Sequence, residues 1–69
     1  MDWAVIVGAN IRRLRKAKGL TQEQLAHEAG FAMRYLAGVE RAEENVTLKY
    51  LVKIADALGV EPGDLLARQ

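Results

Sequence analysis

The sequence contains no cysteine, and this absence excludes disulfide bonds and any zinc site built on thiolates. No apolar stretch approaches the length of about 20 residues that a membrane-spanning helix needs, since the run Trp3–Val7 is far too short. Residues 1–10 also lack the basic segment that begins a secretory signal peptide. The 69 residues leave room for one domain, so we expect a single soluble, cytoplasmic unit over 1–69.

Neither sign of charge is in large excess, because the formal net charge is only +1. The charges are nevertheless unevenly distributed. Residues 1–42 hold seven Lys or Arg and four acids, whereas residues 43–69 hold three and five. Five of the cations fall between positions 12 and 18. From charge alone, this cluster is either a solvated helix face or a patch for a polyanion.

Residues suited to catalysis or metal binding are few. His27 is the sole histidine, is expected on the outward side of a helix, and cannot form a zinc site alone. The acids Glu43, Glu44 and Asp64 are too isolated for a paired-carboxylate site, and no Ser-His-Asp set or glycine-rich phosphate loop occurs. We therefore expect no enzyme activity, no metal, no cofactor and no small-molecule ligand.

What the sequence does contain is helical periodicity from end to end. A first helix that ends at Gly19 is predicted by apolar residues at spacings of four and three: Trp3, Val7, Ile11 and Leu14. A second helix is predicted over Gln22–Ala29, because Thr21 and Gln24 can form a capping box and Gly30 can stop the helix.

Three further helices are expected downstream. The third runs from about Ala32 to Arg41 and is followed by a loop over Ala42–Val46. The fourth begins after Thr47 as its N-cap, ends at Gly59 and carries a clear apolar face of Leu48, Leu51, Ile54, Ala55 and Leu58. A last short helix starts near Pro62 and reaches about Ala67. The expected fold is all-α, with five helices.

Residues 22–41 consist of two short helices joined by a tight turn. Ala26 is small where the two helices pass closest, and Gly30 stands where the chain must take a positive φ. The apolar residues fall on the inner side of both helices: Leu25, Ala29, Phe31, Leu36 and Val39. This combination is typical of the helix-turn-helix motif.

Several sequence motifs occur together in a set order: Ile-Arg-Arg-Leu-Arg, Lys-Gly-Leu-Thr-Gln-Glu-Gln-Leu-Ala, Tyr-Leu-Ala-Gly-Val-Glu-Arg, Asn-Val-Thr-Leu and Ile-Ala-Asp-Ala-Leu-Gly-Val. Through these motifs, residues 11–66 resemble the Cro/CI-type, or XRE-like, helix-turn-helix family. Within that family they are most similar to single-domain controller proteins of restriction–modification systems. The resemblance implies a compact five-helix lambda-repressor-like domain whose third helix enters the DNA major groove, usually as a two-fold dimer. It also implies a sequence-specific transcriptional regulator, either a repressor or a controller, that binds an operator.

Five residues of the third helix are candidates for contact with bases: Met33, Arg34, Tyr35, Ala37 and Gly38. Arg34 is the one strong reader, because a guanidinium can bond guanine O6 and N7 together; its alternative role is a phosphate contact. Met33 either touches a thymine methyl or packs over the turn. Tyr35 either bonds DNA or is a buried core tyrosine.

Five other residues are candidates for contact with phosphate: Thr21, Gln22, Arg12, Arg41 and Asn45. Thr21 and Gln22 stand at a helix N-terminus, where free N–H groups and the dipole favour an anion. The resemblance assigns backbone contacts to Gln22 and Asn45, although Thr21 is also a cap and Asn45 can simply shape its loop. It further implies an ion pair between Arg15 and Glu40 that ties the first helix to the third.

Four positions depart from the family pattern. Ala32 lacks the usual capping side chain, which costs about 1 kcal/mol of helix stability. Ala42 stands where the family usually has a glycine, and an alanine is strained there if the position is left-handed. Glu43 and Glu44 lie where relatives often carry basic residues, and they would repel phosphate.

The acidic C-terminal half carries four residues that either complete the core or form a homodimer interface: Val60, Pro62, Leu65 and Leu66. The resemblance favours the interface, which places two recognition helices about 34 Å apart on one face of DNA. Two other functions remain open from the residues. One is an antitoxin-like or adaptor module whose main partner is a protein, and the other is a scaffold that does not bind DNA.

Overall fold

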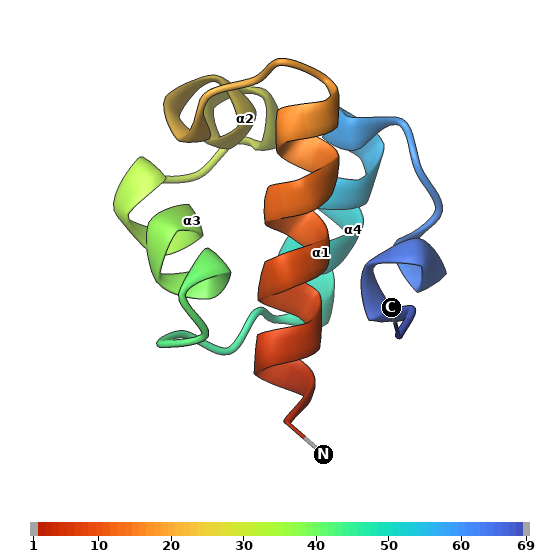
Figure 1. Cartoon of the computed structure of the whole chain (residues 1–69). Helices are drawn as coiled ribbons and strands as arrows, with labels where there is room; N and C mark the ends of the chain where they lie inside the picture. The colour runs from red at the N-terminus through yellow and green to blue at the C-terminus, as the bar shows by residue number, and fades with distance from the viewer. Residues whose placement is uncertain (1, 69) are drawn as a thin grey trace.

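The computed structural model describes residues 2–68, in which four α-helices and one short 3₁₀-helix enclose a core (Figure 1). They are α1 (Trp3–Ala17), α2 (Gln22–Ala29), α3 (Met33–Glu40), α4 (Leu48–Leu58) and the 3₁₀-helix η1 (Pro62–Leu66). The expected all-α class is confirmed, and no strand occurs within residues 2–68. Of the five helices expected, four are α-helices within residues 2–68, and the last short segment forms only 3₁₀ structure, as short helical pieces commonly do. None of these helices is long and apolar enough to cross a membrane.

Short-range signals in the sequence set the helix boundaries. The Thr21 hydroxyl accepts a hydrogen bond from the N–H of Gln24 at 3.0 Å, and Gln24 Oε1 accepts one from the N–H of Thr21 at 2.8 Å. Thr47 caps α4 by accepting from the N–H of Tyr50 at 3.2 Å. Gly30 has a φ of +84°, which lets the chain turn sharply from α2 into α3. These caps and this turn are the ones that the sequence predicted.

α1 crosses the middle of the molecule and packs against both α3 and η1 (Figure 1). Gly8 allows the close approach to α3, since a Cβ at this position would lie 2.9 Å from the carbonyl oxygen of Glu40. On the η1 side, Asn10 is buried and its Nδ2 donates to the carbonyl oxygens of Leu65 and Ala67 at 3.0 and 2.7 Å. The largest apolar side chains of the core that are completely buried are Ile11, Leu25, Leu36, Ile54, Leu65 and Val39.

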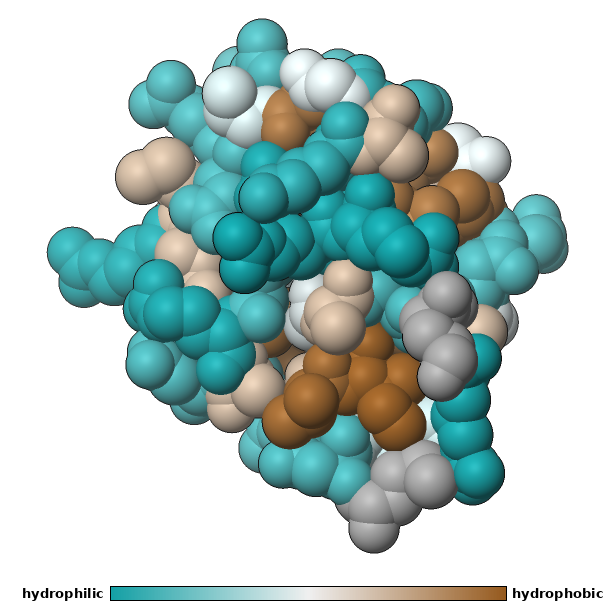
Figure 2. All heavy atoms as spheres, viewed as in Figure 1, coloured by the Kyte–Doolittle hydropathy of each residue, from teal (hydrophilic) through white to brown (hydrophobic). Residues whose placement is uncertain are grey.

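Two apolar residues expected on inward faces are exposed. Trp3 and Leu48 are 49% and 75% exposed, because each lies in the first turn of its helix, beyond the end of the core. Val5 is also exposed on α1. Figure 2 shows apolar side chains gathered low on this face, over the first turns of α1, below a band of hydrophilic side chains. A second, smaller group of apolar side chains is visible at the upper right of the same view.

Candidate nucleic-acid interface

α3 has one buried and one outward side. Leu36 and Val39 are buried in the core. On the outward side, Met33 is 48% exposed, Arg34 is exposed and Ala37 is half-buried. These outward residues lie in the first turns of α3, the part of a recognition helix that reads base edges in helix-turn-helix proteins.

Tyr35 belongs to a cluster of three aromatic rings. Its ring centroid lies 5.5 Å from that of Phe31 and 5.3 Å from that of Tyr50. Its hydroxyl donates to the carbonyl oxygen of Asn45 at 3.1 Å, so the side chain supports the loop that follows α3. The half-buried ring agrees with the structural alternative for this residue, and a contact of Tyr35 with DNA stays a prediction.

Gly38 faces the loop rather than the outside. The residue is buried, and a Cβ at this position would lie 2.7 Å from Cγ of Glu44. Its carbonyl oxygen accepts from the N–H groups of Glu43 and Glu44 at 2.8 and 3.2 Å. The expected base contact of Gly38 is wrong, because the loop folds back over this position.

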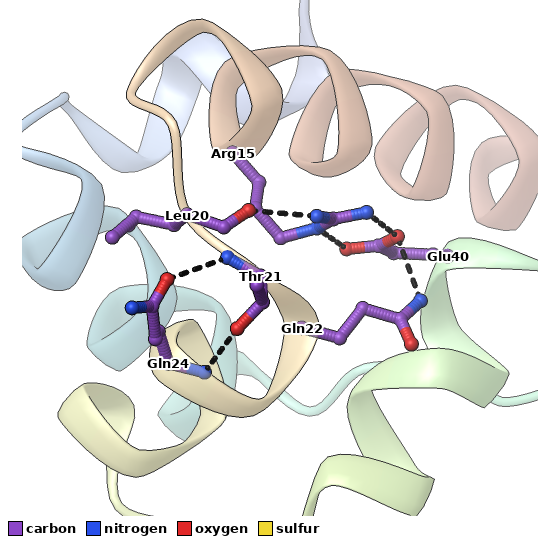
Figure 3. A network of polar contacts seen from close by, with 6 residues as sticks. All are labelled: Arg15, Leu20, Thr21, Gln22, Gln24 and Glu40. Atoms are coloured by element: carbon purple, nitrogen blue, oxygen red, sulfur yellow. Dashed lines mark hydrogen bonds and ion pairs between the residues drawn. The ribbon is translucent and has the colours of Figure 1, made fainter.

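A buried network joins α1, α2 and α3 (Figure 3). Arg15 donates from Nε and Nη2 to the two carboxylate oxygens of Glu40 at 2.7 and 3.0 Å, and from Nη1 to the carbonyl oxygen of Leu20 at 2.8 Å. The side chains of Arg15 and Glu40 are only 10% and 3% exposed. The expected ion pair is therefore confirmed, and its two parallel bonds fix the end of α3 against α1.

Gln22 is an unexpected member of this network. Its Nε2 donates to Glu40 Oε1 at 3.0 Å, which sets the direction of the side chain at the start of α2. A carboxamide has a second N–H, and that donor remains available for another acceptor. Thr21, Gln22 and Met33 line one shallow depression, so the α2 N-terminus and the start of α3 share a surface. Sequence spacing gave no signal for this contact, since 18 positions separate Gln22 from Glu40.

A second groove, between α1 and the end of α3, is lined by four cations: Arg12, Arg13, Lys16 and Arg41. Arg41 is held by Glu43, whose Oε1 lies 3.1 Å from Nε and 3.0 Å from Nη2. This hydrogen bond, together with the charge of Glu43, raises the pKa of Arg41. Ala42 between them has a φ of +62°, so this position is left-handed and its alanine is strained.

The four apolar residues expected at a dimer interface have different environments. Leu65 is completely buried in the core, so its assignment to an interface is wrong; η1 turns this side chain inward between α1 and α4. Val60 and Pro62 are half-buried, whereas Leu66 is 42% exposed.

Leu66 instead lines a different feature, an open apolar cleft of about 270 Å³. The cleft lies between the start of α1, the loop after α3, the start of α4 and η1. We call it the apolar cleft; its lining residues are Trp3, Ala4, Val7, Val39, Glu44, Asn45, Val46, Leu48, Leu51 and Leu66. Helical periodicity gives no signal for this cleft, because it predicts that Trp3 and Leu48 lie on the inward faces of their helices.

Residues 2–68 contain no group of three or more His, Cys, Asp or Glu side chains placed to hold a metal ion. His27 is exposed on α2, as its position in the sequence predicted. Every buried side-chain nitrogen or oxygen in the described part of the chain has a hydrogen-bond partner.

Comparison with known proteins supports one assignment for this arrangement. A family model described as helix-turn-helix matches residues 11–65. Control protein C.SmaI of Serratia marcescens is 44% identical over 69 residues, which cover 100% of this chain and 82% of that protein. The crystal structure of the restriction-modification controller protein C.AhdI from Aeromonas hydrophila is similar with a TM-score of 0.88 and 47% identity, covering 90% of this chain and 94% of that chain.

A crystal structure of SinR, the master regulator for biofilm formation, in complex with DNA is also similar. It has a TM-score of 0.84 and 35% identity, and it covers 88% of this chain and 98% of that chain. The resemblance to controller proteins is confirmed by these relatives. The chain belongs to the helix-turn-helix family, whose members are DNA-binding transcriptional regulators and not enzymes.

Proposed function

We propose that this regulator binds an operator as a homodimer in the cytoplasm, with α3 of each copy in the major groove. The observation that carries the proposal is the common surface of the α2 N-terminus and the start of α3, where Met33 borders Thr21 and Gln22. This surface presents side chains that can read bases beside groups that can bind phosphate. The structure of SinR in complex with DNA, which is 35% identical to this chain, supports DNA binding by a domain of this fold.

The outward residues of α3 suggest what the operator contains. Arg34 is exposed and can bond guanine O6 and N7 together, which discriminates by about 1–3 kcal/mol against other bases. Met33 and Ala37 offer apolar contact instead, and the groove feature that this chemistry fits is the thymine methyl. We therefore expect each half-site to contain a guanine opposite Arg34 and a thymine opposite Met33 or Ala37.

Phosphate contacts are expected on both sides of α3. On one side, Gln22 has a free N–H and stands with Thr21 at the first turn of α2, where backbone N–H groups and the helix dipole favour an anion. On the other side, Arg12 and Arg41 line the cationic groove beside the end of α3. The exposed side chain of Asn45 completes the set in the loop.

A second copy of the chain is the occupant that we propose for the apolar cleft. The cleft borders the loop after α3. A two-fold dimer that reads two successive half-sites needs its recognition helices about 34 Å apart on one face of the DNA. The protomer exposes 4322 Å², and a standard interface of about 800 Å² per partner would cover about a fifth of it. Trp3, Leu48 and Leu66 supply the exposed apolar surface that such an interface needs.

Substitution of one reader and one phosphate-binding residue tests the operator proposal. Arg34→Ala should abolish discrimination between operator and random DNA, whereas Arg12→Ala should lower both affinities and flatten their salt dependence by about one phosphate contact. The operator is first located by footprinting upstream of the protein's own gene. An unchanged footprint and affinity for Arg34→Ala would show that Arg34 does not read bases.

Sedimentation tests the dimer. Leu48→Asp places a charge in the apolar cleft at a residue that is 75% exposed, so the protomer should stay folded and become monomeric. Val52→Asp is the matched control, because Val52 is exposed on the same helix outside the cleft. If Leu48→Asp sediments as the wild type does, the cleft is not the dimer interface.

A further inference from the structure

Two acids follow α3 at a position that faces DNA in the proposed complex, and they differ in what they contact. Glu43 binds Arg41 through Oε1, at 3.1 Å from Nε and 3.0 Å from Nη2. Glu44 lies over Gly38 and lines the apolar cleft. Within residues 2–68, Arg41 is the one member of the cationic groove that forms an ion pair.

The backbone holds Glu43 in place for this contact. Ala42 has a φ of +62°, which turns the chain back toward the end of α3. The N–H of Glu43 then donates to the carbonyl oxygen of Gly38 at 2.8 Å. The loop backbone therefore places the carboxylate of Glu43 next to the guanidinium of Arg41.

The pair is accessible enough to be displaced. The side chains of Arg41 and Glu43 are 57% and 63% exposed. Exposed ion pairs contribute little to stability, so an anion that approaches with several other favourable contacts can take the place of the carboxylate. A phosphate oxygen makes the same kind of charge-assisted hydrogen bond to a guanidinium as a carboxylate oxygen does.

We propose that Glu43 competes with DNA phosphate for the guanidinium of Arg41 and so limits the affinity of this regulator for the DNA backbone. The inference rests on the proposed function, which places Arg41 at the phosphate backbone. Because phosphate contacts carry no sequence information, Glu43 lowers the affinity for every duplex to the same degree. The specific complex then depends more on the reading side chains of α3 than on charge.

The test compares two acids that carry the same charge. Glu43→Gln and Glu44→Gln each raise the net charge by one, but only Glu43→Gln releases Arg41. Binding of a random-sequence duplex is measured across a range of salt concentrations, with thermal unfolding as a check that both variants are folded. Sedimentation checks that Glu44→Gln, whose residue lines the apolar cleft, keeps the oligomeric state of the wild type. We expect Glu43→Gln to bind about two- to fivefold tighter, with a salt dependence steeper by about one phosphate contact. Glu44→Gln should change less in both quantities.

The same pair of substitutions in an Arg41→Gln background completes the test. There we expect Glu43→Gln to have no more effect than Glu44→Gln, because no guanidinium remains to be released. Two results would overturn the inference. One is an equal gain in affinity from both substitutions in the protein that retains Arg41, and the other is a full effect of Glu43→Gln in the Arg41→Gln background. Either result would mean that the acids act only by repelling the charge of the DNA.

The design separates this inference from the proposed function. Two results test the proposed function: binding of duplex DNA by the wild type, and loss of discrimination between operator and random DNA in Arg34→Ala. A wild-type protein that binds DNA but shows no difference between the Glu43 and Glu44 variants overturns the inference alone. A wild-type protein that binds no duplex overturns both.

Discussion

Removal of Glu40 should cost this small domain a large part of its stability. Glu40→Ala leaves the Arg15 guanidinium, with a side chain only 10% exposed, without its carboxylate. At an effective dielectric constant of about 20 and a charge separation of about 4 Å, the lost attraction is about 4 kcal/mol. Loss of one partner from buried pairs is known to cost about 3–5 kcal/mol. We expect about 3 kcal/mol here, because Arg15 keeps its hydrogen bond to the carbonyl oxygen of Leu20.

That value is large for a chain of this size. At about 0.05–0.15 kcal/mol per residue, 69 residues correspond to a total stability of about 3–10 kcal/mol. The melting temperature should fall by about 12–24 °C, which thermal unfolding followed by circular dichroism measures directly. Glu28→Ala is the matched control, since this acid is exposed on α2 and should change the free energy of unfolding by less than about 0.5 kcal/mol.

A double variant separates stability from function. Arg15→Met with Glu40→Leu removes both charges, and such apolar replacements of buried pairs are often neutral or stabilising. We expect the free energy of unfolding of the double variant to recover to within about 1 kcal/mol of the wild type. Its affinity for DNA should nevertheless be lower than that of the wild type, because Gln22 has lost the acceptor that orients it. The reasoning is refuted if Glu40→Ala costs less than about 1 kcal/mol, or if the double variant is no more stable than the single one.

Three further predictions concern packing and backbone. Gly8→Ala should destabilise the protein by about 1–3 kcal/mol in urea unfolding, because the new Cβ would lie 2.9 Å from the carbonyl oxygen of Glu40; Gly63→Ala, which meets nothing within 4 Å, is the control. Ala42→Gly should stabilise the protein by about 0.5–1 kcal/mol in the same assay, since a φ of +62° favours glycine, and a loss of stability would contradict this strain. Asn10→Ala should cost about 1–3 kcal/mol and increase hydrogen exchange in η1, because two carbonyl oxygens lose their donor; unchanged exchange would show that the amide does not anchor η1.

The sequence predicted those parts of the fold that depend on short-range chemistry. The capping box at Thr21, the left-handed Gly30 and the apolar spacing of α2 and α3 each act within a few residues, so they can be recognised without coordinates. The pair of Arg15 and Glu40 is different. The pair was expected from the family resemblance alone. Gln22, which joins the pair through a hydrogen bond to Glu40, lies on another helix, and no local sequence pattern indicates this contact.

The errors arose where one residue's environment depends on distant segments. Leu65 and Leu66 are adjacent leucines, and only the docking of η1 decides that the first is buried and the second exposed. Gly38 lies on α3 beside outward residues, yet the loop after α3 folds back and covers it. Leu48 continues the apolar spacing of α4, but the core ends before it. Periodicity shows which residues share a face, and not how far along the helix that face is covered.

The double packing of α1 has a consequence for the spacing of operator half-sites. Through Gly8, α1 lies directly against α3, and through Asn10 it holds η1, so no flexible linker separates the reading helix from the residues of the proposed dimer interface. Each extra base pair between half-sites moves the second one by about 3.4 Å along the DNA axis and about 35° around it. A protomer built in this way has no hinge with which to follow that movement. The DNA would have to twist instead, and in the proposed dimer the regulator itself would fix how many base pairs lie between the two halves of the operator.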